Sequence, residues 1–347
     1  MVRSAEPRVR QCPIDASLFG KSMAVTLRDI AKKLDISHVT VSLVLNDRRD
    51  VTISDETRAR VIDMAQKMGY RPNHAARALA KGRTQMIALW MASPSKLYYG
   101  KVFETLYSLI RAAGYETVFC LADYADSTRK PYDWPVDGIV AVDTYELVGK
   151  FELPKGIPVV TLGSHAESRS DSVTVDIYGG ATQATQHLVD IGCKRIAHVT
   201  TQRPLLERSG RSAAYKAVLK TAGLKPEVVL CQPGGAQMVR ESICDYVKAH
   251  GLPDGFFCYS DDFGFATMRA LADMGYSVGK DCAVIGFDNV PEAELSIPSL
   301  SSVAQPLDDL CRVGMHFLLN RIREPQLERQ VSSINMSLVA RESTQRD

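Results

Sequence analysis

The stretch from Val25 to Asn46, VTLRDIAKKLDISHVTVSLVLN, constrains the fold more than any other part of the chain. It predicts two short helices joined by a tight turn at residues 35–36. Thr26 can cap the first helix, with Asp29 as the acidic half of a capping box, and Ser37 can cap the second. The first helix carries apolar residues at the spacing of one buried face, at Leu27, Ile30, Ala31 and Leu34.

The second predicted helix, residues 37–46, has a core side and an open side. Its core side points toward the first helix and consists of Val41, Val44 and Leu45. The residues left to face outward are His38, Val39, Ser42 and Leu43. A helix pair with such a polar and small-residue face has the helix-turn-helix arrangement, whose second helix enters the DNA major groove. On this stretch alone, an ordinary helical hairpin inside a larger α domain is the alternative.

Charge is distributed unevenly along the 347 residues. Residues 1–83 hold 16 Lys and Arg against 9 Asp and Glu, a balance of +7. The other 264 residues hold 26 against 31, a balance of −5. A basic N-terminal module on a mildly acidic body is typical of a DNA-binding head on a regulatory domain. Charge alone leaves open a charged helical face without a partner.

The sequence carries no sign of export or of a membrane span. The eight cysteines are scattered, form no C-x-x-C pair and mostly lie in apolar runs, which predicts thiols in a reducing compartment. No apolar run reaches about 18 residues. The polar, basic N-terminus lacks the apolar core of a signal peptide. We therefore expect a cytoplasmic, nucleoid-associated protein with no membrane partner.

A third helix is predicted to begin after its cap, Ser54, and to end at Gly69. In the GYRPN stretch that follows, Pro72 disfavours the α region for the residue before it, so the chain turns. Residues 73–80 then suit one more helix, which is too short to be stable alone in water. This pattern predicts a helix that folds on a partner, with a plain linker helix as the alternative.

These motifs together resemble a known family. VTLRDIAKKLDIS, TVS-VLN, S-ETR-RV, GYRPN and ARALA are similar in order and spacing to the DNA-binding head of the lac-repressor/gal-repressor family of bacterial transcription regulators. The resemblance covers roughly residues 24–344. It implies that residues 37–46 form the recognition helix. It also implies that residues 73–80 form a hinge helix that pairs in the minor groove, with Leu79 as the wedge that unstacks a base step.

The DNA contacts follow from the helix faces and from this resemblance. Val39 and Leu43 are apolar where relatives carry hydrogen-bonding residues, so contacts to thymine methyl groups are expected to outweigh bidentate hydrogen bonds. A Leu43 half-buried against the helix or the partner is the alternative. Phosphate contacts are expected from the polar residues near the helix starts and ends. The predicted DNA-binding set is Thr26, Ser37, His38, Val39, Thr40, Ser42, Leu43, Asn46, Asn73, Ala76 and Leu79.

From residue 85 onward, short apolar runs alternate with helices. Met86–Ala92 is a continuous apolar run, as expected for a strand buried on both faces. A helix is expected at Lys101–Ala113. Further strands are expected at Thr117–Leu121, Gly138–Val142, Pro158–Leu162, Arg195–Val199, Phe256–Tyr259 and Cys282–Phe287. The alternation predicts parallel α/β sheets in two subdomains, with ligands bound at the carboxyl ends of the strands in the cleft between them.

The segments SVTVD, GFDN, IPSLSSV and the closing REST resemble the same family, whose body fold is shared with periplasmic sugar-binding proteins. The fold class expected is a small all-α helix-turn-helix head plus a hinge helix, then an α/β periplasmic-binding-protein-like body of two parallel-sheet subdomains. Residues 1–22 are expected to be a basic extension that is either disordered or a mis-assigned start. The expected domains are residues 23–70 for DNA binding, 71–84 for the hinge and 85–347 for effector binding and dimerisation.

The resemblance also implies an effector site in the cleft. Arg211, in RSAAY, matches the family's cleft arginine, and Asp288, in GFDN, matches its strand-end carboxylate. Five fixed donors suit Arg to sugar hydroxyls or a carboxylate, so the pair suits a polar, hydroxylated small molecule. Each residue alone is also compatible with a structural salt bridge. The predicted effector-binding set is Tyr98, Tyr99, Asp176, Arg211, Asp261 and Asp288.

Two segments depart from the family pattern. Gly234-Gly235-Ala236 stands where relatives place an aromatic ring, which argues against a ligand stacked at that point. The segment Ala122–Trp134 is shorter than the usual helix between the second and third strands, so that helix is expected to be truncated or lost.

No catalytic or metal motif is present. His187 and His198 are interpreted as packing histidines, and the sequence has no H-E-x-x-H, G-x-S-x-G or P-loop. We expect no enzyme, no cofactor and no metal. We expect a ligand-responsive regulator, a repressor, that binds double-stranded, pseudo-palindromic operator DNA as a homodimer. The chain has no heptad tail, which argues against a tail-linked tetramer. The alternatives are a solute-binding protein of the same body fold and an α/β enzyme.

Overall fold

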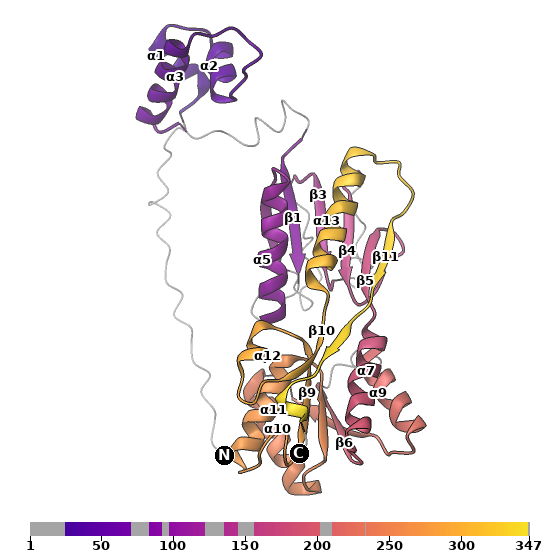
Figure 1. The fold of residues 1–347 in the computed structure, drawn as a ribbon. Coiled ribbons are helices and arrows are strands. Elements are labelled where there is room, and N and C mark those ends of the chain that lie inside the picture. Colours follow the sequence, from indigo (N-terminus) through magenta and orange to yellow (C-terminus); the bar gives the residue numbers. More distant parts are fainter. Residues whose placement is uncertain are drawn as a thin grey trace, which may run out of the picture. The chain divides into compact units, whose positions relative to one another are not determined.

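The computed structural model describes residues 25–70, 83–91, 97–121, 135–144, 156–201, 210–232 and 234–345. The chain divides into two compact units, Met1–Lys81 and Gly82–Asp347, here called the head and the body (Figure 1). The expected extension 1–22, the shortened segment 122–134 and the hinge residues Asn73, Ala76 and Leu79 lie outside the described residues.

The head contains α1 (Leu27–Leu34), α2 (His38–Leu45) and α3 (Asp55–Lys67) around one small core. Its fully or nearly buried residues are Ile30, Ala31, Val41, Val44, Val61 and Ala65. Leu45, expected in the core, is half-buried and packs against it. Gly69 follows α3 with φ +66, a left-handed conformation that suits a residue without Cβ. The predicted three-helix head is confirmed.

The first body subdomain is built on a six-stranded, wholly parallel sheet of order β11-β5-β4-β3-β1-β2. Its strands are β1 (Met86–Met91), β2 (Glu116–Leu121), β3 (Gly138–Val142), β4 (Val159–Gly163), β5 (Asp171–Val175) and β11 (Val331–Ile334). Helices α5 (Leu97–Ala112) and α13 (Leu307–Arg323) lie side by side on one face (Figure 1). Gly314 lets α13 approach β4, since a Cβ there would lie 2.4 Å from Leu162 Cδ2.

The second subdomain is built on a sheet of order β12-β10-β9-β8-β6-β7, parallel except for the β10–β12 pair. Its strands are β6 (Ile196–Thr201), β7 (Glu227–Cys231), β8 (Gly255–Cys258), β9 (Ala283–Asp288), β10 (Ser301–Ala304) and β12 (Ser337–Val339). Its helices are α7 (Ile177–Asp190), α9 (Gly210–Thr221), α10 (Ala236–His250), α11 (Asp261–Asp273), α12 (Pro291–Leu295) and the short 3₁₀ helix η2 (Glu342–Thr344). Helices α7 and α9 cover one face, and α10 and α11 cover the other.

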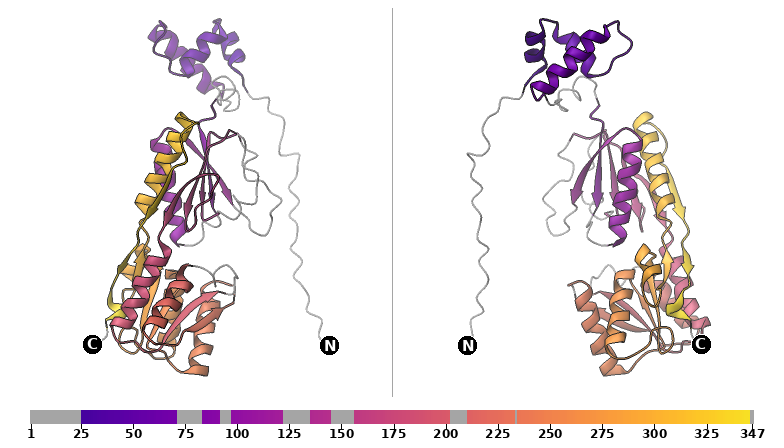
Figure 2. Two further views of the ribbon diagram at one scale, coloured as in Figure 1. Left: turned by 90° about the vertical axis from the view of Figure 1, so that its right-hand side faces the viewer. Right: turned by 60° about the vertical axis from the view of Figure 1, so that its left-hand side comes forward.

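The chain passes between the two subdomains three times, after β5, after β10 and after β11 (Figures 1 and 2). One hydrophobic core runs through both, because residues of α5 and α13 belong to the same buried cluster as residues of α7 and α9. The two-subdomain α/β body predicted from the alternation of strands and helices is therefore confirmed.

The seven strands expected from the sequence are all present, with ends within two residues of those predicted. Helix α5 begins at Leu97, four residues before the predicted Lys101, so Tyr98 and Tyr99 lie inside its first turn. Strands β5, β7, β10, β11 and β12 were not predicted individually. Within the described residues, no helix is long and apolar enough to cross a membrane.

Candidate functional site

Side-chain caps hold the two helices of the predicted DNA-binding motif. The Thr26 hydroxyl accepts a hydrogen bond from the Asp29 amide, and an Asp29 carboxylate oxygen accepts from the Thr26 amide at 2.8 Å, which completes a capping box. The Ser37 hydroxyl accepts from the Thr40 amide at 3.0 Å. Asp35, with φ +53, makes the turn between α1 and α2. The caps and the turn thus have the partners that the sequence predicts.

Helix α2 presents an open face opposite its buried residues. His38 and Val39 are exposed, and 53% of the Val39 surface remains accessible. Ser42 and Leu43 are half-buried. Leu43 is not among the partly buried residues that pack on the core of the described head. The half burial of Leu43 agrees with the alternative interpretation, and its contact with thymine methyl groups stays a prediction.

The polar residues predicted to contact phosphates already hold the helix ends. Thr26, Ser37 and Thr40 take part in the caps described above. Asn46 Nδ2 donates to the Ser42 carbonyl at 2.8 Å at the end of α2. These side chains fix the position of the helices that a DNA backbone would meet.

Two arginines next to the recognition helix were not singled out from the sequence. In the loop after α2, Arg48 pairs with Asp50, and Arg49 Nε lies 2.7 Å from Asp47 Oδ1. Both pairs are exposed, so their net contribution to stability is small. DNA phosphates can compete for these guanidinium groups.

In the body, Arg211 lies near the start of α9 and is buried between two rings. Its Cζ lies 3.9 Å from the ring centroid of Phe287 and 4.5 Å from that of Tyr259. Its Nη2 lies 3.8 Å from Asp288 Oδ1. The two rings fix the guanidinium plane. Arg211 and Asp288, predicted separately, are brought together.

Asp288 ends β9 with φ +112, an unusual conformation for a residue other than glycine. Its Oδ1 accepts a hydrogen bond of 2.7 Å from Gln305 Nε2. Burial raises the pKa of Asp288 to about 7, and the charge of Arg211 opposes that rise. Asp288 is therefore a buried carboxyl group that titrates near neutral pH.

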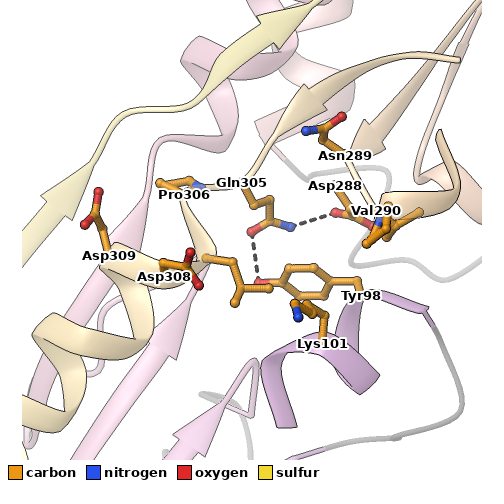
Figure 3. Close-up of a pocket in the computed structure, with 11 residues that line it drawn as sticks. Tyr98, Lys101, Asp288, Asn289, Val290, Gln305, Pro306, Asp308 and Asp309 are labelled. Carbon is orange, nitrogen blue, oxygen red and sulfur yellow. Dashed lines mark hydrogen bonds between the residues drawn. The ribbon is translucent and has the colours of Figure 1, made fainter. Parts of the chain in front are cut away.

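A chain of hydrogen bonds connects Asp288 with the first subdomain (Figure 3). The Tyr98 hydroxyl, on α5, donates to Gln305 Oε1 at 3.0 Å, and Gln305 in turn donates to Asp288. A pocket of about 390 Å³ lies beside these hydrogen bonds, and Tyr98, Asp288 and Gln305 are among the residues that line it. Arg211 is not among them, so we locate the candidate effector site by the side chains around Arg211 and not by this pocket.

Asp143 is a cleft residue that the sequence reasoning missed. It follows β3, with φ +48, and accepts hydrogen bonds of 3.2 Å from the Tyr99 hydroxyl and from the Ser164 amide. Burial raises its pKa, while the Ser164 amide and the charge of Arg211 lower it. The available signal was a polar residue directly after a predicted strand.

Two predicted effector residues have structural partners instead. Asp261 is 1% exposed and accepts from the Val290 amide at 2.8 Å and the Ser302 hydroxyl at 2.5 Å. Burial, followed by the charge of Asp288, raises its pKa to about 8. Asp176 caps α7 by accepting from the Gly179 amide at 2.8 Å. Their predicted ligand contacts stay predictions.

Several buried polar atoms near the strand ends have no hydrogen-bond partner within the described chain. Thr144 lies two residues after β3, Thr200 lies near the end of β6 and Ser260 lies two residues after β8. Their hydroxyl oxygens and Arg211 Nε are buried without a partner. Unpaired buried polar groups are costly, so this arrangement is suited to a bound ligand that supplies the missing partners.

Among the described residues no metal site is found, and the aromatic rings of the cleft come from other positions than residues 234–236. The described residues contain no group of three potential metal ligands. Gly234 and Gly235 precede α10 with positive φ and carry no ring. Tyr259 and Phe287 supply rings beside Arg211 instead.

Comparisons with known proteins match both units. Residues 26–73 match the model of bacterial regulatory proteins, lacI family, and residues 185–344 match that of a periplasmic binding protein-like domain. The chain is 28% identical to the ribose operon repressor of Halalkalibacterium halodurans over 92% of this chain and 97% of that protein. Its fold is similar to a lac repressor dimer bound to operator, with TM-score 0.76, 21% identity and coverage of 92% and 99%. It is also similar to a regulator from Enterococcus faecium with bound ribose, with TM-score 0.68, 22% identity and coverage of 75% and 98%.

Proposed function

We propose that this member of the LacI family is a cytoplasmic repressor controlled by a small polar effector. As a member of that family it is a DNA-binding transcription regulator and not an enzyme. In this proposal two heads of a homodimer bind a pseudo-palindromic operator, since protein two-fold symmetry is mirrored in the DNA site. The ribose operon repressor and the operator-bound lac repressor dimer are the relatives that support it.

The proposal that the head binds DNA rests mainly on the open face of α2. His38 supplies the donor and acceptor on that face, and Val39 and Leu43 supply methyl groups for thymine contacts. The hinge residues Asn73, Ala76 and Leu79 are proposed to enter the minor groove.

The effector part rests on the cleft around Arg211. Arginine and carboxylate groups lie together there, beside buried polar atoms that lack partners within the described chain. Such a set suits a ligand rich in hydroxyl groups, and the relative from Enterococcus faecium holds ribose. A solute-binding protein could have the same body, but solute binding does not require a head with an exposed recognition helix.

The homodimer is supported by exposed apolar side chains on the body. Leu295 at the end of α12 is 78% exposed, and Ile297 beyond it is 96% exposed. On the first subdomain, Tyr107 of α5 and Leu121 of β2 are also exposed. Exposed apolar residues that adjoin one another, as Leu295 and Ile297 do in sequence, can mark an interaction surface, whereas apolar residues exposed singly are common on monomers.

Ligand binding would favour one arrangement of the subdomains and so change operator affinity. The coupling free energy between two such sites is typically about 1–3 kcal/mol. A ligand alters the equilibrium only through its different affinity for the two states.

Selection of binding sites from a random pool of double-stranded DNA tests the proposal. The full chain is expected to enrich a sequence with two inverted half-sites, and its affinity is expected to fall steeply with added salt because phosphate contacts release counterions. Enrichment of no sequence above the non-specific background would contradict it.

A further inference from the structure

We propose that His198 is a positioning residue for Arg211. Its ring accepts a hydrogen bond from Ser212 and thereby sets the rotation of α9 that directs the arginine toward Asp288. The sequence indicated only a packing histidine, a role that another ring of similar size could fill. The ligand contact of Arg211 rests on the function proposed above, whereas the placement of its guanidinium group does not.

The two nitrogens of the buried His198 ring have different partners. Nδ1 lies 2.9 Å from the Phe257 carbonyl oxygen, and Nε2 lies 3.1 Å from Ser212 Oγ. A carbonyl oxygen can only accept, so Nδ1 carries the proton of the neutral ring and Nε2 accepts from the Ser212 hydroxyl. Burial lowers the pKa of His198 to about 4, so the ring is uncharged at neutral pH.

Helix α9 is fixed to β6 by two side chains on one helix face. Ser212 and Tyr215 are three residues apart on α9, and their partners His198 and Ile196 are two apart on β6. Both spacings bring residues to one side of their element. The Tyr215 hydroxyl donates to the Ile196 carbonyl at 2.7 Å. The two hydrogen bonds therefore define which face of α9 meets the sheet.

The direction of Arg211 follows from this rotation of α9. Arg211 directly precedes Ser212, and successive residues of an α-helix are turned by about 100° from one another. A turn of that size would carry the guanidinium away from Asp288, whose Oδ1 now lies 3.8 Å from Arg211 Nη2. The bond from Ser212 to His198 lies closer to Arg211 along the helix than the Tyr215 bond, so it controls the first turn.

The His198 ring also belongs to a row of aromatic rings that ends at Arg211. His198 is in register with Phe257 on the neighbouring strand, and the two rings are stacked with centroids 5.0 Å apart. The Phe257 and Phe287 centroids lie 6.4 Å apart, and Arg211 Cζ lies 3.9 Å from the Phe287 centroid. His198 thus reaches Arg211 by two routes, one through α9 and one across the sheet.

The guanidinium of Arg211 has weak polar contacts with the described part of the body. The distance of 3.8 Å to Asp288 is longer than a hydrogen bond, and Arg211 Nε is buried without a partner among the described residues. The aromatic rings and the rotation of α9 therefore matter more for its placement than they would for a fully hydrogen-bonded arginine.

Nuclear magnetic resonance of the full chain without ligand measures the placement of Arg211. An aromatic ring beneath a guanidinium moves the side-chain signals of the arginine upfield, and the Nε–H signal is assigned by its loss in Arg211→Lys. The wild type is expected to show this upfield shift and a His198 ring with its proton on Nδ1. An Arg211 signal without the shift, or a His198 proton on Nε2, would overturn the inference.

His198→Phe separates positioning from packing, because it keeps a ring of similar size and removes the acceptor for Ser212. Ser212→Ala removes only the hydroxyl group. Both variants are expected to lose most of the upfield shift of Arg211. An Arg211 signal at the wild-type position in either variant would refute the positioning role. Thermal unfolding identifies a variant that does not fold, and if His198→Phe is one, Ser212→Ala decides alone.

His187→Phe is the matched control, because it breaks another bond between a histidine and a hydroxyl group. His187, half-buried on α7, has its Nε2 3.0 Å from Thr344 Oγ1. The control should leave the Arg211 signal unchanged, and an equal loss of the shift there would contradict a specific role of His198. The proposed function is judged separately, by selection of DNA sites, so either claim can fail without the other.

Discussion

At the scale of single residues, buried acids dominate the chemistry of the body. Burial raises the pKa of Asp261 to about 8 and that of Asp288 to about 7, from an ordinary value of 3.8. Both groups are therefore protonated in the folded chain at pH values where the unfolded chain is ionised. These two groups take up protons when the chain folds in this window, so their contribution to stability depends on pH with a definite sign.

The contribution of Asp261 and Asp288 to the free energy of unfolding is expected to fall as pH rises from about 4 to about 9, because these two groups hold more protons in the folded state than in the unfolded state. Above about pH 9 this contribution levels off, since both groups are then ionised in the folded and the unfolded state. His198 and His187, whose pKa values are lowered by burial, contribute with the opposite sign below about pH 6.5. Thermal unfolding across this range measures the slope of stability against pH. Asp261→Asn is expected to make that slope more positive, because the negative contribution of Asp261 is removed.

The matched control for that experiment is Asp190→Asn, which replaces an exposed carboxyl group. It should leave the slope unchanged. An Asp261→Asn slope equal to that of the wild type would contradict the assigned burial effect.

Sequence identified some cleft residues and not others for a physical reason. Arg211 and Asp288 belong to recognisable sequence motifs. They lie at the start of α9 and at the end of β9, which face the cleft. Asp143 and Gln305 carry no comparable signal, because their direction depends on space left by Gly163 and on a crossover between subdomains. Asp261 matched a motif position, yet its carboxylate holds the start of α12 through Val290.

At the scale of elements, local patterns predicted the head well. The caps Thr26, Ser37 and Ser54 each accept the backbone hydrogen bond expected of them. Continuous apolar runs such as β1 predicted the buried strands. Strands β11 and β12 are short and partly exposed, with sequences VSSI and SLV, so nothing local distinguishes them from a loop.

The hinge helix is an element whose role stays a prediction, and Leu79→Ala tests it. Loss of the apolar wedge is expected to weaken operator binding at least about tenfold, or ~1.4 kcal/mol, because the central base step is no longer held unstacked. Binding to a duplex of unrelated sequence is expected to stay nearly unchanged. Fluorescence anisotropy with both duplexes measures the two affinities.

Lys81→Ala serves as the comparison. Removal of a positive charge should weaken binding to both duplexes alike and should lower the salt dependence of that binding. Equal losses on the two duplexes for Leu79→Ala would contradict the wedge role.

At the scale of the whole molecule, the order of strands could not be read from the sequence. Three crossings between the subdomains place β11 in the first sheet and β12 in the second, although only two residues separate them. The alternation of strands and helices indicates parallel sheets but does not say which subdomain a late strand joins. Long-range pairing, and the shared core it creates, decides that.

Dimerisation also belongs to this scale, and Leu295→Glu tests it. Leu295 is 78% exposed at the end of α12, so its replacement should leave the monomer folded while a buried charge disrupts the interface. Light scattering is expected to show dimer in the wild type and monomer in the variant, with weaker operator binding. Val331→Glu, another exposed apolar position, is the control expected to stay dimeric. A monomeric wild type, or a dimeric Leu295→Glu, would contradict the proposed surface.

The most direct test of the account measures operator affinity with and without the sugar that binds the cleft, in the wild type and in Arg211→Ala. Arg211 touches the candidate site and is remote from the head in sequence, so its loss should spare operator binding itself. We predict a saturable change of operator affinity of about 5- to 150-fold in the wild type. We predict no change in the variant at the same sugar concentrations. A wild type whose operator affinity ignores a sugar bound in the cleft would contradict the central claim, as would a variant that responds like the wild type.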